Sequence, residues 1–292
     1  MNIPTDYQFS FNTNNAEKKI KKMFGPFPST AQYALKHKEE KHTSESWGEW
    51  TLKSFPDNNH TGYFSTSSGL GVGVALLKNG IPVMSQTPLE LESHLVAQHS
   101  AKGRVVVAGL GLAMITLSLL KKKEITSLTV LEIDNEIISM FPSILTGESN
   151  KLWTDNINTG RLKIIQTDCK LPFNDDVLKQ IGKVDYLWAD IWNELCSTEA
   201  LSITQNLSNQ LKPTQCDFWG AEIEIALKTL KQGKYMCLKT FKEVAHGFKL
   251  PLSILSMDGK KLKMYAELSL IAAKNTYQQE KLANKKKLSV TI

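Results

Sequence analysis

The stretch Gly103-Arg-Val-Val-Val-Ala-Gly-Leu-Gly-Leu-Ala-Met114 decides the fold of this chain. Its β-branched residues predict a buried strand, which stops at two glycines and gives way to an apolar segment typical of a helix. About twenty residues later, Leu128-Thr-Val-Leu-Glu-Ile-Asp134 is a second apolar run that ends in acidic residues. A strand, a glycine turn, a helix and a strand closed by a carboxylate describe a nucleotide-binding βαβ unit. We therefore expect the chain to bind a nucleoside-type cofactor.

The same alternation of strands and helices continues along the chain. The predicted strands are 104–108, 128–132, 162–168 and 184–190, and the predicted helices are 111–122, 134–141 and 174–181. Beyond residue 190 the pattern weakens, with an amphipathic helix over 217–232 and a fifth strand at 235–239. Strands that alternate with helices at this spacing predict an α/β fold, a doubly wound Rossmann-like parallel sheet.

A small antiparallel β unit precedes this region. Residues 47–55 alternate as a half-buried strand does, and two further apolar runs flank Asn79-Gly80, a strong hairpin signal. A connecting helix should begin after Thr87, with Glu90 completing a capping box. We expect four parts: a polar N-terminal extension (1–42), the β unit with its helix (43–95), the Rossmann-like cofactor-binding domain (96–273) and a polar, mobile C-terminal tail (274–292).

Composition indicates a cytoplasmic globular protein. The chain has 292 residues, of which 41% are hydrophobic, enough for a proper core. No apolar run approaches the roughly 18 to 20 residues that span a bilayer, and the polar N-terminus argues against a standard signal peptide. The four cysteines form no Cys-x-x-Cys pair, which predicts reduced thiols and no metal site.

The charge pattern argues against a nucleic-acid partner, and a small-molecule substrate is expected instead from the cofactor-site motifs. The net charge of +6 comes almost wholly from lysine, because Arg104 and Arg161 are the only arginines. Nucleic-acid readers rely on arginine for bidentate contacts, so the lysine runs are interpreted as solvated faces and nucleic-acid binding is not expected. The β unit and the apolar segment 137–141 would allow a homodimer.

Three acids end predicted strands: Glu132, Asp168 and Asp190. Ligands of open parallel sheets bind at the carboxyl ends of the strands, so these acids should converge on one crevice with the turn at Gly109. Met114 stands where the dinucleotide fingerprint has its third glycine, which disfavours NAD.

The motif series over roughly residues 80 to 195 resembles class I S-adenosylmethionine-dependent methyltransferases. It consists of the glycine turn, Glu132 with Asp134, then Asp168-Cys169, then Asp190. The resemblance implies that Gly109 and Gly111 line the methionyl part of the cofactor, that Glu132 binds its ribose, and that Asp168 and Cys169 contact its adenine.

A closer resemblance is to the spermidine synthases, which have this fold with an N-terminal β unit. It is carried by Asn79-Gly-Ile-Pro-Val-Met-Ser-Gln-Thr-Pro-Leu-Glu-Leu-Glu-Ser-His94. Two acids of that family are replaced here, by Leu112 and Asn193. Because those acids hold amines, their loss indicates a different substrate.

We therefore expect methyl transfer from S-adenosylmethionine, whose carboxylate an aspartate at position 112 would repel, to an unidentified small molecule. Aminopropyl transfer from decarboxylated S-adenosylmethionine is the alternative, and a non-catalytic binding module with this fold is the second.

Asp190 is the candidate catalytic base, although a cap on the following turn would also explain a carboxylate there. Trp192 and Glu194 follow it, while Gln86, Glu90 and His94 would form the upper wall of the pocket. Glu90 and His94 are four residues apart, a spacing shared by metal pairs and by surface ion pairs, and two residues alone do not predict a metal site. The predicted substrate-contacting residues are Gln86, Glu90, Trp192 and Glu194.

Overall fold

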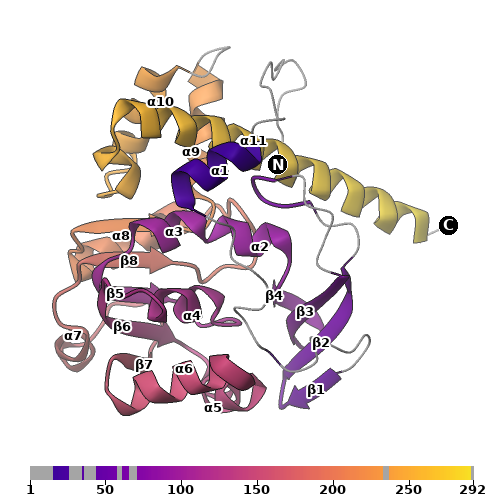
Figure 1. Cartoon of the computed structure of the whole chain (residues 1–292), viewed down its shortest axis with the longest axis vertical. Coiled ribbons are helices and arrows are strands. Elements are labelled where there is room, and N and C mark those ends of the chain that lie inside the picture. The colour runs from indigo at the N-terminus through magenta and orange to yellow at the C-terminus, as the bar shows by residue number, and fades with distance from the viewer. Residues whose placement is uncertain are drawn as a thin grey trace.

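The computed structural model describes residues 16–25, 35, 44–57, 61–65, 71–232 and 237–290, with side chains described up to residue 278. Its centre is a five-stranded parallel sheet (Figure 1), whose strands lie in the order β7-β6-β5-β8-β9. The strands are β5 (Gly103–Ala108), β6 (Ile125–Glu132), β7 (Leu162–Gln166), β8 (Tyr186–Ala189) and β9 (Gln215–Phe218). β5, which comes first in the chain among these five strands, lies in the middle of the sheet, so the predicted Rossmann-like fold is confirmed.

Successive residues along the strands point to opposite faces of the sheet and belong to two hydrophobic clusters, one on each face. Val106 and Leu187 pack in one cluster, whereas Val107 and Trp188 pack in the other. The first cluster meets α1 (Ala16–Phe24), α8 (Ala200–Leu211), α9 (Ala221–Gln232), α10 (Leu238–Gly247) and α11 (Gly259–Val290). The second meets α4 (Met114–Leu120), α5 (Asn135–Ile144) and α6 (Gly147–Asn158). Two further short helices are α7 (Asp175–Ile181) and the 3-10 helix η3 (Ser253–Ser256).

The predicted antiparallel unit is confirmed as a second sheet in the order β1-β2-β3-β4. Its strands are β1 (Ser44–Trp47), β2 (Trp50–Asp57), β3 (Gly71–Lys78) and β4 (Ile81–Ser85). Asn79 and Gly80 both have positive φ, 51° and 77°, as the two central residues of a type I′ hairpin turn require.

The connecting helix differs from its prediction. It is two short helices, α2 (Pro88–Ser93) and α3 (Leu95–Ser100), which break at His94. The predicted capping box does not form, because the Thr87 side chain makes no cap hydrogen bond and the Glu90 carboxylate accepts hydrogen bonds from Ser85 instead.

The fifth strand lies twenty residues earlier than predicted. Asp217, expected to begin a helix, belongs to β9, and that helix begins at Ala221. Asp217 looks polar in the sequence, but it is buried and accepts hydrogen bonds from the Tyr186 hydroxyl at 2.8 Å and the Ser253 N–H at 3.2 Å. The strand predicted at 235–239 falls partly outside the described residues, and its last two residues open α10.

The boundary predicted at residue 274 falls inside α11, which runs beside α1 (Figure 1). Asn275 is buried, and its amide donates to the backbone carbonyls of Gly62, Tyr63 and Ser65 at 3.1 to 3.2 Å. Glu92 accepts hydrogen bonds from the same segment at the Phe64 and Ser65 N–H groups. Helix α11 therefore anchors residues 62–65, which lie between β2 and β3. Among the described residues, no helix is long and apolar enough to span a membrane.

Candidate functional site

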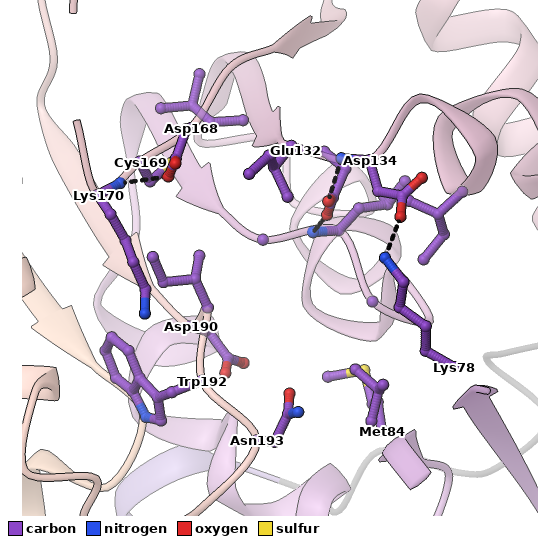
Figure 2. A pocket seen from close by; sticks show the side chains of 18 of the residues that line it. Lys78, Met84, Glu132, Asp134, Asp168, Cys169, Lys170, Asp190, Trp192 and Asn193 are labelled. Atoms are coloured by element: carbon purple, nitrogen blue, oxygen red, sulfur yellow. Dashed lines mark hydrogen bonds and ion pairs between the residues drawn. The ribbon is translucent and has the colours of Figure 1, made fainter. Parts of the chain in front are cut away.

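A cavity of about 300 Å³ opens at the carboxyl ends of β5, β6, β7 and β8. Figure 2 shows its polar side chains, among them Glu132, Asp168 and Asp190. The N-terminal sheet supplies a further wall, with Trp50, Lys78, Val83 and Met84. Both sheets therefore enclose a space at the switch point where ligands of open α/β sheets bind.

The two glycines of the turn have positive φ, and at Gly109 a close approach of backbone also requires glycine. Gly109 has φ +98°, and a Cβ atom there would lie 2.1 Å from the backbone carbonyl oxygen of Asp190. Gly111 has φ +50°, and its Cβ would lie 2.5 Å from the Met84 sulfur. The turn is thus packed between the end of β8 and the hairpin strand β4, and both glycines line the cavity.

Glu132 holds the glycine turn and the end of β6 together. Its Oε2 accepts a hydrogen bond from the Leu110 N–H and its Oε1 accepts one from the Asp134 N–H, both at 2.9 Å. A carboxylate has about four acceptor positions, so each oxygen retains one for a ligand.

Asp134 ties the N-terminal sheet to this site. Its carboxylate caps α5 and accepts hydrogen bonds from the Lys78 ammonium at 2.7 Å and the Trp50 indole N–H at 3.1 Å. Burial alone would raise the pKa of Asp134, but the hydrogen bonds from Lys78, the Glu136 N–H and Trp50 outweigh it and lower the pKa. Asp134 is therefore an ionised anchor for the hairpin.

Asp168 and Cys169 lie at the end of β7 and line the cavity. The Asp168 Oδ1 accepts a hydrogen bond from the Lys170 N–H at 2.8 Å (Figure 2). Burial, with the nearby charges of Glu132 and Asp168, raises the pKa of Cys169 to about 12. Cys169 is thus a neutral thiol and no nucleophile at neutral pH.

Asp190 follows β8, and its side chain is 9% exposed on the cavity wall. Its Oδ2 lies 3.4 Å from Nε2 of the fully buried His94. Burial raises the pKa of the nearby Glu90 to about 8, opposed by hydrogen bonds from Ser85 and assisted by the Asp190 charge. Asp190 therefore lies on the cavity wall next to two further titratable side chains, His94 and Glu90.

The structure brings together most, but not all, of the predicted site residues. Gly109, Gly111, Glu132, Asp168, Cys169, Asp190 and Trp192 line the cavity. Gln86, Glu90 and Glu194 are not among its lining residues: Gln86 is buried, Glu90 is held by Ser85, and Glu194 is exposed. Leu112 is also buried off the wall, whereas Asn193 lies on it.

Sequence reasoning missed the contribution of Trp50, Lys78 and Met84. Their position depends on how the two sheets pack, for which the sequence gives no local signal. Asp134 was visible beside Glu132, but its bond to Lys78 joins residues 56 positions apart. Among the described residues, no three His, Cys, Asp or Glu side chains are grouped to hold a metal ion.

Comparisons with protein-family models and with curated proteins give no match. Among solved structures, a spermidine synthase from Thermotoga maritima matches with a TM-score of 0.36 and 15% identity, covering 58% of this chain and 53% of its own. A probable spermidine synthase from Corynebacterium glutamicum has a TM-score of 0.33 and 11% identity, over 58% of this chain and 60% of its own. A putative sarcosine dimethylglycine methyltransferase from Galdieria sulphuraria has a TM-score of 0.28 and 15% identity, over 65% of this chain and 78% of its own.

These structural neighbours come from the two classes that the sequence resembles, and the chain spans about half the length of the first. Their similarity concerns the fold only. The fold itself follows from the strand order and the position of the cavity, so the chain has a Rossmann-like, doubly wound fold preceded by an antiparallel sheet.

Proposed function

We propose that this protein binds S-adenosylmethionine in the cavity and transfers its methyl group to a small-molecule acceptor. One observation carries the proposal: the glycine turn, Glu132 and Asp168 line a single cavity at the carboxyl edge of the sheet. These groups can hold, in turn, a flexible chain, a ribose and an adenine amino group, as the resemblance to methyltransferases implies.

Ile133 provides an independent test of this fit. It is a large hydrophobic side chain that is 59% exposed, and it lines the cavity between Glu132 and Asp134. A flat purine ring would cover it, while the free acceptor positions of Glu132 would take ribose hydroxyls. The residues present therefore suit a nucleoside.

Asp190 is the group that would act on the acceptor. When bound, the cofactor supplies a methyl group made electrophilic by the sulfonium charge. The acceptor nitrogen or oxygen forms its new bond to that carbon while the carbon–sulfur bond breaks, and sulfur keeps the electron pair. Asp190 takes the proton that the acceptor loses, and the walls around it hold the acceptor in line.

Two residues favour the intact cofactor over its decarboxylated form. Met84 presents an uncharged thioether at the glycine turn, where its sulfur lies 3.1 Å from the Leu112 nitrogen. Asn193 presents an amide where spermidine synthases have an acid. An amine-rich ligand thus meets fewer carboxylates than aminopropyl transfer requires, although that transfer remains the alternative and a non-catalytic binding module the second.

The acceptor is proposed to be small, and the protein cytoplasmic. Both arginines are engaged in contacts within the chain: Arg104 pairs with Asp185 at 2.8 Å, and Arg161 donates to backbone carbonyls, including that of Leu120 at 2.8 Å. They are therefore not displayed for nucleic acid. The four cysteines are free thiols, which suits a reducing compartment.

Calorimetric titration with S-adenosylmethionine and with its decarboxylated form tests the proposal. We expect the intact cofactor to bind more tightly, Glu132→Gln to weaken it, and Glu148→Gln, an exposed substitution in α6, to leave it unchanged. A panel of small amines and phenols with methyl-labelled cofactor then identifies the acceptor. Preference for the decarboxylated form would favour aminopropyl transfer, tight binding without turnover the non-catalytic module, and no binding would refute cofactor use.

A further inference from the structure

His94 contacts Asp190 without lining the cavity. It occupies the break between α2 and α3, with φ −84° and ψ −6°, and its side chain is fully buried. Its Nε2 lies 3.4 Å from the Asp190 Oδ2, while His94 itself is not among the residues that line the cavity. The helix break thus brings an imidazole to the end of β8.

The surroundings of His94 define its hydrogen bonding. Its Nδ1 is buried without a hydrogen-bond partner among the described residues, and its ring meets Trp188 edge-on at 6.0 Å between centroids. A neutral imidazole has one N–H, and an ionised carboxylate can only accept. The tautomer that satisfies Asp190 therefore carries its proton on Nε2.

The neighbouring Glu90 is held by another partner. Its Oε1 accepts from the Ser85 N–H at 2.9 Å and from the Ser85 hydroxyl at 2.8 Å. The carboxylate oxygen within hydrogen-bond distance of the His94 ring is Oδ2 of Asp190.

We propose that His94 is a positioning residue for Asp190: its Nε2–H holds one carboxylate oxygen so that the other faces the acceptor. This inference rests on the proposed function, in which Asp190 takes a proton. The 3.4 Å separation is longer than the usual 2.7 to 3.2 Å of such bonds. Catalytic hydrogen bonds are often long before substrate binds and shorten afterwards.

The contact itself is testable without any acceptor. Nitrogen-15 NMR of the histidine side chains in the full chain reports which ring nitrogen carries the proton. We expect the Nε2–H tautomer for His94, and we expect Asp190→Asn to shift its resonances while leaving those of the exposed His99 in place. Unchanged His94 resonances in that variant would overturn the inference.

The catalytic consequence is read from matched variants. With the best acceptor from the panel, His94→Leu should lower kcat by about 10- to 100-fold, as outer-sphere positioning residues do, without changing cofactor affinity. His94→Gln, which keeps an N–H donor, should restore most of the rate, and His99→Gln should be silent. Equal rates in the Leu and Gln variants would refute positioning. If wild-type protein fails to bind the cofactor, the proposed function falls, whereas the NMR result still decides the His94–Asp190 contact.

Discussion

Replacing Gly109 with alanine should disrupt the junction between the glycine turn and the candidate base. The new Cβ would lie 2.1 Å from the Asp190 carbonyl oxygen, and this neighbour is backbone that cannot rotate away. Gly109 also has φ +98°, a conformation that side chains with a Cβ rarely adopt. The substitution therefore combines a conformational penalty with a steric one.

The two penalties can be estimated separately. The left-handed conformation costs about 1 to 2 kcal/mol for a residue with a Cβ, and overpacking costs typically about 1 to 3 kcal/mol. The total of roughly 2 to 5 kcal/mol would lower Tm by at least several degrees, at about 2 to 4 °C per kcal/mol for chains of this size. Cofactor affinity should also fall, because the Asp190 backbone must move.

Gly147→Ala is the matched control. Gly147 has φ +51°, yet nothing lies within 4 Å of its Cβ position, so the substitution carries a conformational penalty without a steric one. Differential scanning calorimetry of both variants, with and without S-adenosylmethionine, should show Gly109→Ala less stable by at least the steric penalty of about 1 to 3 kcal/mol, because φ +98° is also less accessible to alanine than φ +51°. If Gly109→Ala were no less stable than Gly147→Ala, the close approach of the Asp190 carbonyl would be wrong.

Three further predictions concern charged groups. Glu132→Gln should raise the cofactor Kd by at least about tenfold in calorimetry, because a hydrogen bond to a charged group contributes about 1.5 to 3 kcal/mol; an unchanged Kd would remove Glu132 from the ribose site. Burial raises the pKa of Glu222 to about 7, so its folded state favours the protonated form and its contribution to stability is lost as pH rises from about 4.5 through 7. Chemical denaturation should therefore show that the free energy of unfolding of Glu222→Gln rises relative to that of the wild type between pH 5 and pH 8. If the two unfolding free energies ran parallel with pH, Glu222 would not be a buried acid with a raised pKa. Arg104 holds the pKa of Asp185 at about 2, a contribution present above the ordinary value and lost as pH falls from about 4 to 2. Arg104→Met should make the free energy of unfolding less dependent on pH in that window, and because Arg104 is 42% exposed, the loss of stability at neutral pH should be small.

The parts of the fold and site that the sequence predicts are those encoded locally. Val105–Ala108 is a largely β-branched run followed by a glycine, and Glu132, Asp168 and Asp190 each end or follow a strand that is predicted from its local pattern. Parallel pairing brings the ends of neighbouring strands to one edge, so local pattern alone places these acids together. The hairpin at Asn79-Gly80 is equally local.

The remainder depends on contacts between distant segments. Asp217 is a strand residue because Tyr186 and Ser253 satisfy its buried carboxylate, and neither contact is visible from position 217. The wall formed by Lys78 and Met84 requires the docking of two sheets, and the break at His94 interrupts a stretch whose pattern reads as one continuous helix. The predicted roles of Glu90, in a capping box and on the pocket wall, were wrong because its carboxylate accepts hydrogen bonds from Ser85 instead.

The bond of Asn275 to the segment at 62–65 has a consequence for the order of events during synthesis. The two partners are separated by up to 213 residues, so the connection between β2 and β3 leaves the ribosome long before α11 does. Glu92 can hold residues 64 and 65 early, whereas the amide of Asn275 can reach this segment only after residue 275 has been synthesised. The segment is therefore fully secured long after β2 and β3 have formed, and stalled chains that stop before residue 275 should expose residues 62–65 to proteases.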